Sequence, residues 1–226
     1  MKIAVLGTGM VGQALAARLA ELGHDVTVGT RDVEVTLAKK DPDTMGNPPY
    51  ATWAHAHPQV HLATYAEAAA DAQLLVNATS GNVSLAALQA AGTENLAGKI
   101  LIDIANPLDF SAGFPPSLFV KDTDSLGEQI QAAFPRLKVV KALNTLTAAL
   151  MVNPRNLADG DHTVFVSGND ADAKKTVIGL LESFGHTDVI DLGDITTARG
   201  SEMLLPIWLR LMGVLNTPTF NIKVVR

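Results

Sequence analysis

Three glycines close to the start of the chain have the spacing of a turn that holds a diphosphate. Gly7, Gly9 and Gly12 follow an apolar run at residues 2–6 and precede a helical pattern of apolar residues. Gly7 permits a tight turn, Gly9 lets the main chain approach a pyrophosphate, and Gly12 lets the helix pack closely on the strand. The diphosphate would lie at the positive N-terminal end of this helix. An ordinary glycine-containing turn is the alternative, but the flanking strands favour a dinucleotide site made of Gly7, Thr8, Gly9, Met10, Val11 and Gly12.

The end of the next apolar run, residues 25–28, indicates which dinucleotide binds. NAD-binding proteins usually place a carboxylate about twenty residues after the glycines, where it accepts hydrogen bonds from the ribose hydroxyls. Here Gly29, Thr30 and Arg31 occupy that region. A hydroxyl and a guanidinium would bind a 2′-phosphate through charge-assisted contacts, whereas a carboxylate would repel it. Thr30 and Arg31 therefore predict NADP. In the alternative, Arg31 is a solvated cation and Asp32 binds the ribose.

Small polar residues follow three later strands at the point where each strand ends. The first of these strands ends at Ala78 and is followed by Thr79 and Ser80, the second is followed by Ala105, Asn106 and Pro107, and the third by Asn144 and Thr145. Ligands of open α/β sheets bind beyond the carboxyl ends of the strands, so we expect these residues to hold the second half of the cofactor. None is an obvious acid, base or metal ligand. Asn144 and Thr145 therefore receive positioning roles only, and no catalytic residue or metal site is predicted.

One acid lies inside an apolar strand rather than at its end. Asp103 occupies the middle of the run at residues 99–104. An isolated buried carboxylate must find partners, so we expect Asp103 to be a hydrogen-bonded structural residue rather than a catalyst.

The elements that must position these residues alternate regularly between strands and helices. Strands are expected at residues 2–6, 25–28, 60–64, 74–78, 99–104, 138–143, 163–167 and 188–191, and helices at 33–40, 65–71, 84–91, 125–134 and 170–184. This alternation predicts an α/β fold with a doubly wound, mostly parallel sheet of the Rossmann type. We expect a dinucleotide-binding domain at 1–145 and, at 146–226, a small C-terminal α/β part that extends the sheet and packs as one unit with the first.

Two stretches interrupt the alternation. Residues 41–58 contain four prolines and Gly46, which predicts a long irregular insertion. His55, His57 and His61 lie in or near it, but without a carboxylate cluster they indicate solvated or helix-end side chains rather than a metal site. Residues 108–124 are rich in aromatic residues and proline, which is typical of a loop packed over a pocket, although a loop sealing the core would look similar.

The C-terminal segment carries the most apolar pattern of the chain. Residues 201–212 are apolar on nearly every side and contain Pro206, which should kink a helix. A helix so apolar must be buried, either in its own subunit or against a second one. We expect a homodimer formed through this helix, with burial inside one chain as the alternative.

Composition narrows the classes of partner. The chain has 226 residues, of which 47% are hydrophobic, and it contains no cysteine, so disulfides, thiolate metal sites and thiol catalysis are excluded. A formal charge of −6 argues against nucleic acid as a partner. Met1 is followed directly by a core strand, and no apolar run reaches membrane-spanning length. We therefore expect a cytoplasmic protein that binds no membrane.

Four motifs together resemble a known family. They are the glycine turn at 7–12, the strand end at 28–31, the run at 141–145, and the terminal segment from 205–207 to 221–223. In order and spacing, over essentially the full length, they resemble the NADPH-dependent oxidoreductases of the deazaflavin coenzyme factor 420. The chain is more distantly similar to the cytosolic NADPH domain of six-transmembrane metalloreductases. It departs from the family pattern at 42–58 and 108–124, two segments placed to border the acceptor pocket.

The resemblance implies hydride transfer between nicotinamide and a deazaflavin ring, with a small-molecule hydride acceptor as the partner. By this resemblance the rings would be positioned by Thr8, Met10, Ser80, Asn106, Asn144 and Thr145. Met203, Leu204 and Trp208 would wall the pocket, and ordinary core packing is an equal alternative for Trp208. Hydride transfer between two preassembled rings needs proximity and orientation, which agrees with the missing acid and base. The alternatives are an NADPH-dependent reductase of a flavin or ferric chelate, and a non-catalytic NADPH-binding module.

Overall fold

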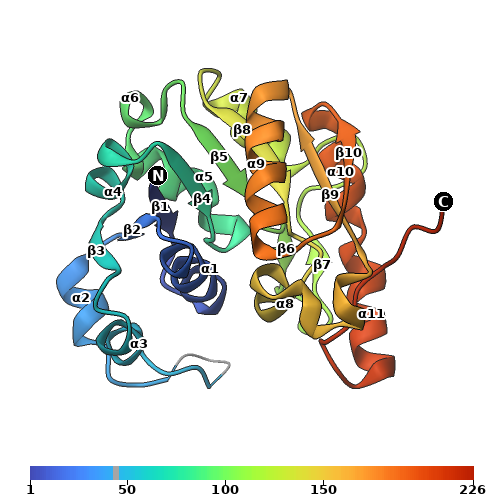
Figure 1. Ribbon diagram of the computed structural model, residues 1–226, viewed down its shortest axis with the longest axis horizontal. Coiled ribbons are helices and arrows are strands. Elements are labelled where there is room, and N and C mark those ends of the chain that lie inside the picture. The colour runs from blue at the N-terminus through green and yellow to red at the C-terminus, as the bar shows by residue number, and fades with distance from the viewer. Residues whose placement is uncertain (43–45) are drawn as a thin grey trace.

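Eight short segments pair into one sheet in the computed structural model, which describes residues 1–42 and 46–226. The strands of this sheet are β1 (Lys2–Leu6), β2 (Asp25–Thr30), β3 (His61–Thr64), β4 (Leu74–Asn77), β5 (Ile100–Asp103), β8 (Lys138–Ala142), β9 (Thr163–Gly168) and β10 (Asp188–Gly193). Their order is β10-β9-β8-β5-β4-β1-β2-β3, and each neighbouring pair is parallel except β8 with β9. The predicted α/β fold with a mostly parallel sheet is confirmed (Figure 1).

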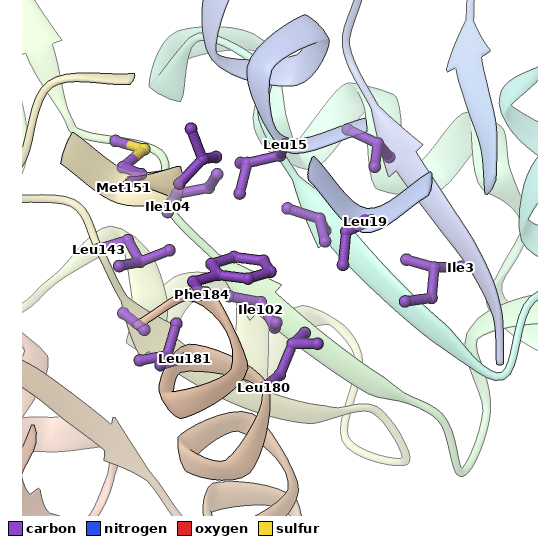
Figure 2. Close-up of a cluster of buried hydrophobic side chains, with 14 of the residues drawn as sticks. Ile3, Leu15, Leu19, Ile102, Ile104, Leu143, Met151, Leu180, Leu181 and Phe184 are labelled. Carbon is purple, nitrogen blue, oxygen red and sulfur yellow. The ribbon is translucent and has the colours of Figure 1, made fainter. Parts of the chain in front are cut away.

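Helices cover both faces of the sheet because most strands are apolar on both sides. The longer helices are α1 (Met10–Glu21), α4 (Tyr65–Asp71), α5 (Gly81–Ala91), α7 (Leu126–Ala133), α9 (Ala171–Phe184) and α11 (Leu205–Leu215). In β1, Ile3 and Val5 belong to the hydrophobic cluster under α1 and α9, whereas Ala4 and Leu6 belong to the cluster under α4, α5 and α7. Figure 2 shows the first cluster, in which Phe184 of α9 faces the side chains from α1 and β5.

The chain reverses its direction of travel across the sheet beside β1. From β1 it proceeds to β2 and β3, and then crosses back to β4 on the other side of β1. Such a reversal leaves a crevice at the carboxyl ends of β1 and β4, because the connections following these two strands leave toward opposite sides. The glycine turn follows β1 at this point.

The C-terminal part of the chain continues the same sheet. β9 pairs with the edge of β8, and α9 packs beneath it in the cluster that also contains α1. The terminal segment returns to β9, where Thr163 N donates to Ile222 O at 2.9 Å and Asn221 Nδ2 donates to Thr163 O at 2.9 Å. The remaining short helices are α2 (Val33–Ala38), α6 (Thr93–Leu96), α8 (Ala148–Val152) and α10 (Ala198–Met203), with 3-10 turns at Pro154–Asn156, Ala158–Gly160 and Ile195–Thr197.

The insertion at 41–58 is more ordered than the sequence predicts. It contains helix α3 (Tyr50–Ala56), so the prediction of an irregular stretch is wrong there; residues 43–45 lie outside the described residues. Pro49 is the N-cap, just before the first turn, where a backbone N–H would have no helical partner. Proline therefore precedes this helix without interrupting it. His57 caps the other end and stacks on Trp53 at a centroid distance of 4.3 Å, as the helix-end prediction requires.

The stretch at 108–124 also contains regular structure. Strands β6 (Leu108–Asp109) and β7 (Ser117–Leu118) pair as an antiparallel hairpin outside the main sheet. Two residues per strand are too few for periodicity to be recognised in the sequence, so the hairpin was not predicted.

The apolar C-terminal segment breaks at the predicted proline. α10 ends at Met203, and α11 begins with Pro206 in its first turn. Within its own chain, however, α11 buries only Leu205 and Leu209, while Val214 is 84% exposed. Burial inside one chain is therefore not observed for most of this helix. In Figure 1, α11 lies at the opposite end of the molecule from α2 and α3. None of the described helices is long and apolar enough to cross a membrane.

Candidate functional site

The glycine turn has two positions that are closed to any side chain and one that is open. Gly7 has φ +122°, and a Cβ there would lie 2.6 Å from Ala78 O. A Cβ on Gly12 would lie 2.1 Å from Gly7 O, so only glycine allows α1 to pack this closely on the turn. A Cβ on Gly9 would meet no protein atom within 4 Å. The tight turn at Gly7 and the close packing at Gly12 are present as predicted, and Gly9 presents bare main chain to open space.

The N-terminus of α1 has no side-chain cap. Gly9 is the N-cap and contributes no side chain, and the first turn contains no acidic residue. The side chain of Gln13 stabilises the turn, because its Nε2 donates a hydrogen bond to Thr8 O at 2.9 Å. The first N–H groups of a helix have no partner within it and carry the positive end of its dipole. An anionic group such as a diphosphate fits these donors.

At the end of β2, the side chains of Thr30 and Asp32 are bonded within the protein, whereas that of Arg31 is not bonded to any described residue. Thr36 Oγ1 donates its only proton to Asp32 O at 2.7 Å. In the 2.8 Å contact between the two threonine hydroxyls, the buried Thr30 must therefore be the donor and Thr36 the acceptor. Thr30 thus has no hydroxyl proton left for a phosphate. Asp32 caps α2, its Oδ1 accepting from Val35 N at 2.9 Å. Arg31 is exposed and makes no hydrogen bond or salt bridge with any described residue, which leaves its guanidinium free for a ligand.

A cavity of about 320 Å³ joins Arg31 to the glycine turn. The glycine turn, the residues after β4 and apolar residues of α5 all contribute to its lining. Tyr65 also lines it; burial raises the pKa of the Tyr65 hydroxyl, and the charge of Arg31 acts in the opposite direction. The lining residues are Gly7, Thr8, Gly9, Arg31, Tyr65, Ala78, Thr79, Ser80, Val83, Ala86, Ala87 and Ala90. An apolar wall beside a free cation suits an adenosine that carries a phosphate.

The turns after β4 and β5 lie against each other at the rim of the sheet. Gly81 opens α5 so close to Asn106 that a Cβ there would be 2.1 Å from Asn106 O. Thr79 is fixed by Asn77, whose Oδ1 accepts from Thr79 Oγ1 at 2.7 Å and from Thr79 N at 3.3 Å. Ser80 is the N-cap of α5, and its hydroxyl makes no capping bond. The rim is therefore fixed by main chain and by Asn77, and Ser80 keeps its hydroxyl for a ligand.

The turn after β8 is tied to the same rim. Asn106 Nδ2 donates to Asn144 O at 2.8 Å, and Asn144 Nδ2 donates to Asn106 Oδ1 at 3.0 Å and to Ser201 O at 3.0 Å. Leu143, just before Asn144, has φ +60°, a left-handed conformation that costs an ordinary residue about 1–2 kcal/mol. The contacts of Asn144 hold this turn in place. Asn144 and Thr145 are both buried, and their positioning role stays a prediction.

A cluster of buried charges lies directly beneath this rim. Lys141 of β8 is 1% exposed, and its Nζ contacts Asp103 Oδ2 at 2.9 Å and Glu202 Oε1 at 2.7 Å, and donates to Ala105 O. The Glu202 carboxylate also accepts from the N-terminus of α7, from Leu126 N at 2.8 Å and Gly127 N at 3.1 Å. Burial acts to lower the pKa of Lys141, but the two carboxylates outweigh it and hold that pKa above its usual value. The predicted structural role of Asp103 is confirmed.

The same cluster fixes the turns after β4 and β5. Asp103 Oδ1 accepts from Asn77 Nδ2 at 2.8 Å and from Ala105 N at 3.3 Å. Asn77 in turn holds Thr79, so one buried network fixes the main chain after β4 and after β5. The pairing of Lys141 with Glu202 was not predicted from the sequence. A lysine in an apolar strand was the available signal, because a buried cation requires a buried acid.

A second cavity, of about 740 Å³, opens from the rim on the other side. Val11, the turns after β4 and β5, and the β6–β7 hairpin contribute to its lining. The residues that line it are Val11, Ala78, Thr79, Ser80, Gly81, Asn82, Ile104, Ala105, Asn106, Leu108, Asp109, Phe110, Ser111 and Phe119. Asp109 is the single ionisable residue among them, and the Ser111 N–H holds the pKa of its carboxyl below the usual value, so it is no proton donor at neutral pH. No cluster of metal-ligating side chains occurs in the described residues.

The two cavities together account for most of the predicted site residues. Val11, Ala105 and Asn106 line the larger cavity, Arg31 lines the smaller one, and Ala78, Thr79 and Ser80 lie between them. Met10 faces a third hollow on the other side of the glycine turn, beside α3. Trp208, predicted either as a pocket wall or as core, stacks on Phe220 at a centroid distance of 5.0 Å. Phe110 and Phe119, which belong to the aromatic stretch predicted to pack over a pocket, line the larger cavity.

Comparison with known proteins places this arrangement among NADP-dependent enzymes. Residues 2–107 match the family model described as NADP oxidoreductase, coenzyme F420-dependent. An F420-dependent NADP reductase of Methanothermobacter marburgensis is 30% identical over 217 residues, covering 93% of this chain and 92% of that protein. A crystal structure from Arthrobacter sp. FB24, of a protein named as a candidate F420-dependent NADP reductase, is 64% identical with a TM-score of 0.97 and full coverage of both chains.

A second group of relatives is longer than this chain. Metalloreductase STEAP3 of Rattus norvegicus is 29% identical over 212 residues, which cover 92% of this chain. The match spans 38% of the length of STEAP3.

Proposed function

The chain belongs to the family of F420-dependent NADP oxidoreductases, and we propose that it transfers a hydride between the nicotinamide of NADP(H) and a deazaflavin coenzyme, factor 420. As a member of this family it is an NADP-dependent oxidoreductase. The observation that carries the finer proposal is the pair of cavities that meet at Ala78, Thr79 and Ser80. One has the free cation and helix N-terminus that suit a phosphorylated dinucleotide, and the other has room for a second ring system.

The residues fit NADP at three points. The uncapped N-terminus of α1 and the bare main chain of Gly9 suit the diphosphate. Arg31, free of protein partners in the described residues, suits the 2′-phosphate, where a guanidinium donates charge-assisted hydrogen bonds. Asp32 is engaged in capping α2, which weakens the alternative that it binds the ribose of NAD. Thr30 contributes its main chain at the strand end rather than its hydroxyl.

The rim residues suit a reaction that needs orientation but no proton transfer by the protein. Ser80 and Asn106 line the larger cavity, and the buried Asn144 is bonded to Asn106; all three are neutral hydrogen-bonding residues. Bound NADPH supplies the hydride and its electron pair. What the chain contributes is proximity and alignment, which account for a large share of the rate in reactions between two bound partners. The hydrogen bonds of Asn77 and Asp103 hold the turns after β4 and β5 in fixed positions, which supports this alignment.

A reductase of flavins or ferric chelates is the second candidate function. It is favoured by the similarity to metalloreductase STEAP3, of which this chain covers 38%. A third possibility, an NADPH-binding module without turnover, would require the larger cavity to accept no electron acceptor.

The decisive experiment is to follow NADPH oxidation by the purified protein at 340 nm with deazaflavin, FMN, FAD and ferric chelate as acceptors. We expect the deazaflavin to give the highest kcat/KM. Faster reduction of FMN or ferric chelate would favour the second function. Tight NADPH binding with no oxidation by any acceptor would favour the binding module.

We also propose that α11 joins two copies of the chain. Ile207, Val214 and Leu215 are at least half exposed on this helix, which is otherwise typical of a buried element. Light scattering should give twice the mass of one chain, and Ile207→Asp combined with Leu215→Asp should give monomers. A monomeric native protein would contradict this proposal. The cytoplasmic location remains a prediction from the sequence.

A further inference from the structure

We propose that Phe110 and Phe119 form an aromatic wall that selects a flat, multi-ring hydride acceptor. This inference rests on the proposed function and deepens it, because it names the residues that choose the acceptor. Both residues line the cavity of about 740 Å³, as do the turns after β4 and β5.

The hairpin that carries the two phenylalanines is attached directly to the cofactor rim. Phe110 follows β6 and Phe119 follows β7. At the base of the hairpin, Leu108 N donates to Asn106 O at 2.8 Å and Phe119 N donates to Pro107 O at 2.9 Å. Asn106 itself is bonded to Asn144 on the next turn. The aromatic wall is therefore fixed relative to the rim that would hold the nicotinamide.

The two side chains have apolar surface to offer. Phe110 is 60% exposed and Phe119 is 43% exposed, although both lie beside a cavity. A single exposed apolar side chain needs no explanation. Two aromatic residues that line one cavity together with Val11 and Ile104 make an apolar slot that is open to a ligand.

The chemistry of this slot distinguishes between the acceptor classes. Phenyl rings stack favourably on other aromatic rings, in offset or edge-to-face geometry. A ferric chelate of a polycarboxylic acid has no such face and is negatively charged. The Asp109 carboxylate lies on the same wall, and its pKa is lowered by the Ser111 N–H, so it stays ionised and repels such an anion. A planar heterocycle with several fused rings is the acceptor that gains from this wall.

Phe114 provides a matched control in the same hairpin. It is 66% exposed and lies in the connection between β6 and β7, but it does not line the cavity. Phe114→Ala therefore removes the same side chain from the same loop without touching the slot. Phe110→Leu is a second control, because it keeps apolar bulk and removes the aromatic face.

The test measures acceptor binding separately from cofactor binding. 8-Hydroxy-5-deazaflavin is titrated into NADP⁺-saturated protein, its fluorescence quenching gives Kd, and steady-state NADPH oxidation gives KM. We expect Phe110→Ala and Phe119→Ala each to raise Kd and KM for the deazaflavin about tenfold, with the Kd for NADPH unchanged. Phe110→Leu should fall between these variants and the native protein, and Phe114→Ala should match the native protein.

The outcomes separate this inference from the proposed function. If the native protein reduces deazaflavin but Phe110→Ala and Phe119→Ala behave like Phe114→Ala, the aromatic wall is wrong and the function stands. If the native protein neither binds nor reduces deazaflavin, both are overturned. If ferric chelate is the better acceptor and the alanine variants leave its KM unchanged, the selection by an aromatic wall is likewise refuted.

Discussion

Two groups of polar residues lie at the same edge of the sheet and differ in how they are satisfied. We call Asp103, Lys141 and Glu202 the buried ion cluster. The open rim, as distinct from the rim formed by the turns after β4, β5 and β8, consists of Gly9 at the N-terminus of α1 and Arg31 at the end of β2. In the buried ion cluster, each charged side chain has partners of opposite charge or backbone donors. In the open rim, the helix N-terminus is uncapped and Arg31 has no partner among the described residues.

The difference separates residues that hold the fold from residues that are available to a ligand. A buried charge without partners is strongly unfavourable, so a fully paired cluster is required by the fold itself. An exposed cation costs little when unpaired, because water solvates it. Changes in the buried ion cluster should therefore act on stability, and changes in the open rim should act on cofactor binding.

The largest effect is expected for Lys141→Met. This change leaves two buried carboxylates without their cation, and breaking a buried pair in this way typically costs about 3–5 kcal/mol of unfolding free energy. Urea unfolding followed by circular dichroism measures it. Lys138→Met is the matched control, because Lys138 is in the same strand but 40% exposed in its pair with Asp170. If Lys141→Met and Lys138→Met had equal unfolding free energies, the idea that the buried ion cluster contributes more to stability than a surface ion pair would be wrong.

His186 is a buried residue outside both regions and should make stability depend on pH. Its Nε2 contacts Met151 O at 2.9 Å, while Nδ1 is buried without a partner in the described residues. Burial lowers the pKa of His186 to about 4. Because the unfolded chain binds the proton near the ordinary pKa of about 6.5, stability is fully present above that pH and is lost as the pH falls toward 4.

The expected loss for His186 is on the order of 3 kcal/mol between pH 7 and pH 4. Unfolding free energies at pH 7, 6, 5 and 4.5 would reveal it as a slope. His186→Gln should flatten that slope, since the titrating ring is gone. An unchanged slope in the variant would assign the pH dependence to other groups.

Arg31→Ala should change cofactor affinity without changing stability. We expect NADP(H) binding to weaken by about 1.5–3 kcal/mol, the worth of a charge-assisted hydrogen bond, and NAD(H) binding to stay nearly unchanged. Isothermal titration with both cofactors measures the difference, and Lys175→Ala is the control, because Lys175 is an exposed cation on α9 that does not line these cavities. Equal losses for NADP(H) and NAD(H) would contradict the assignment of Arg31 to the 2′-phosphate.

The smallest effect compares two glycines of one turn. Gly12→Ala places a Cβ 2.1 Å from Gly7 O and should cost about 1–3 kcal/mol of stability through overpacking. Gly9→Ala meets no protein atom within 4 Å, so it should leave stability nearly unchanged but weaken NADPH binding. Thermal unfolding with and without NADPH tests both variants. If Gly9→Ala bound NADPH like the native protein, the diphosphate would not lie over Gly9.

Much of the fold was predictable because its signals are local. The run at 2–6, the glycines at 7–12 and the capped helix after Ser125 each carry their pattern within about a dozen residues, and each formed as expected. α3 was missed because the prolines that favour a loop also precede a helix. The hairpin was missed because its strands contain two residues each.

The candidate site was predictable to the level of segments but not of partners. The sequence indicated that Thr79, Asn106 and Asn144 would gather at one rim, because parallel strands end on the same side. It did not indicate that Asn106 and Asn144 would bond each other, or that the hydroxyl of Thr30 would be committed to Thr36. These pairings depend on distances of a few ångströms between segments far apart in the chain.

The sequence by itself determined the strand–turn–helix that begins the chain, the NADP preference inferred from Arg31, and the alternation that predicts the sheet. These depend on residue type and short spacing. Only the tertiary structure decided which polar groups are satisfied internally and which remain free for a ligand. Lys141 and Arg31 are both cations near strand ends, yet one is enclosed by two carboxylates and the other is exposed. The physical reason is that partnership and burial arise from packing between distant segments, which no local pattern records.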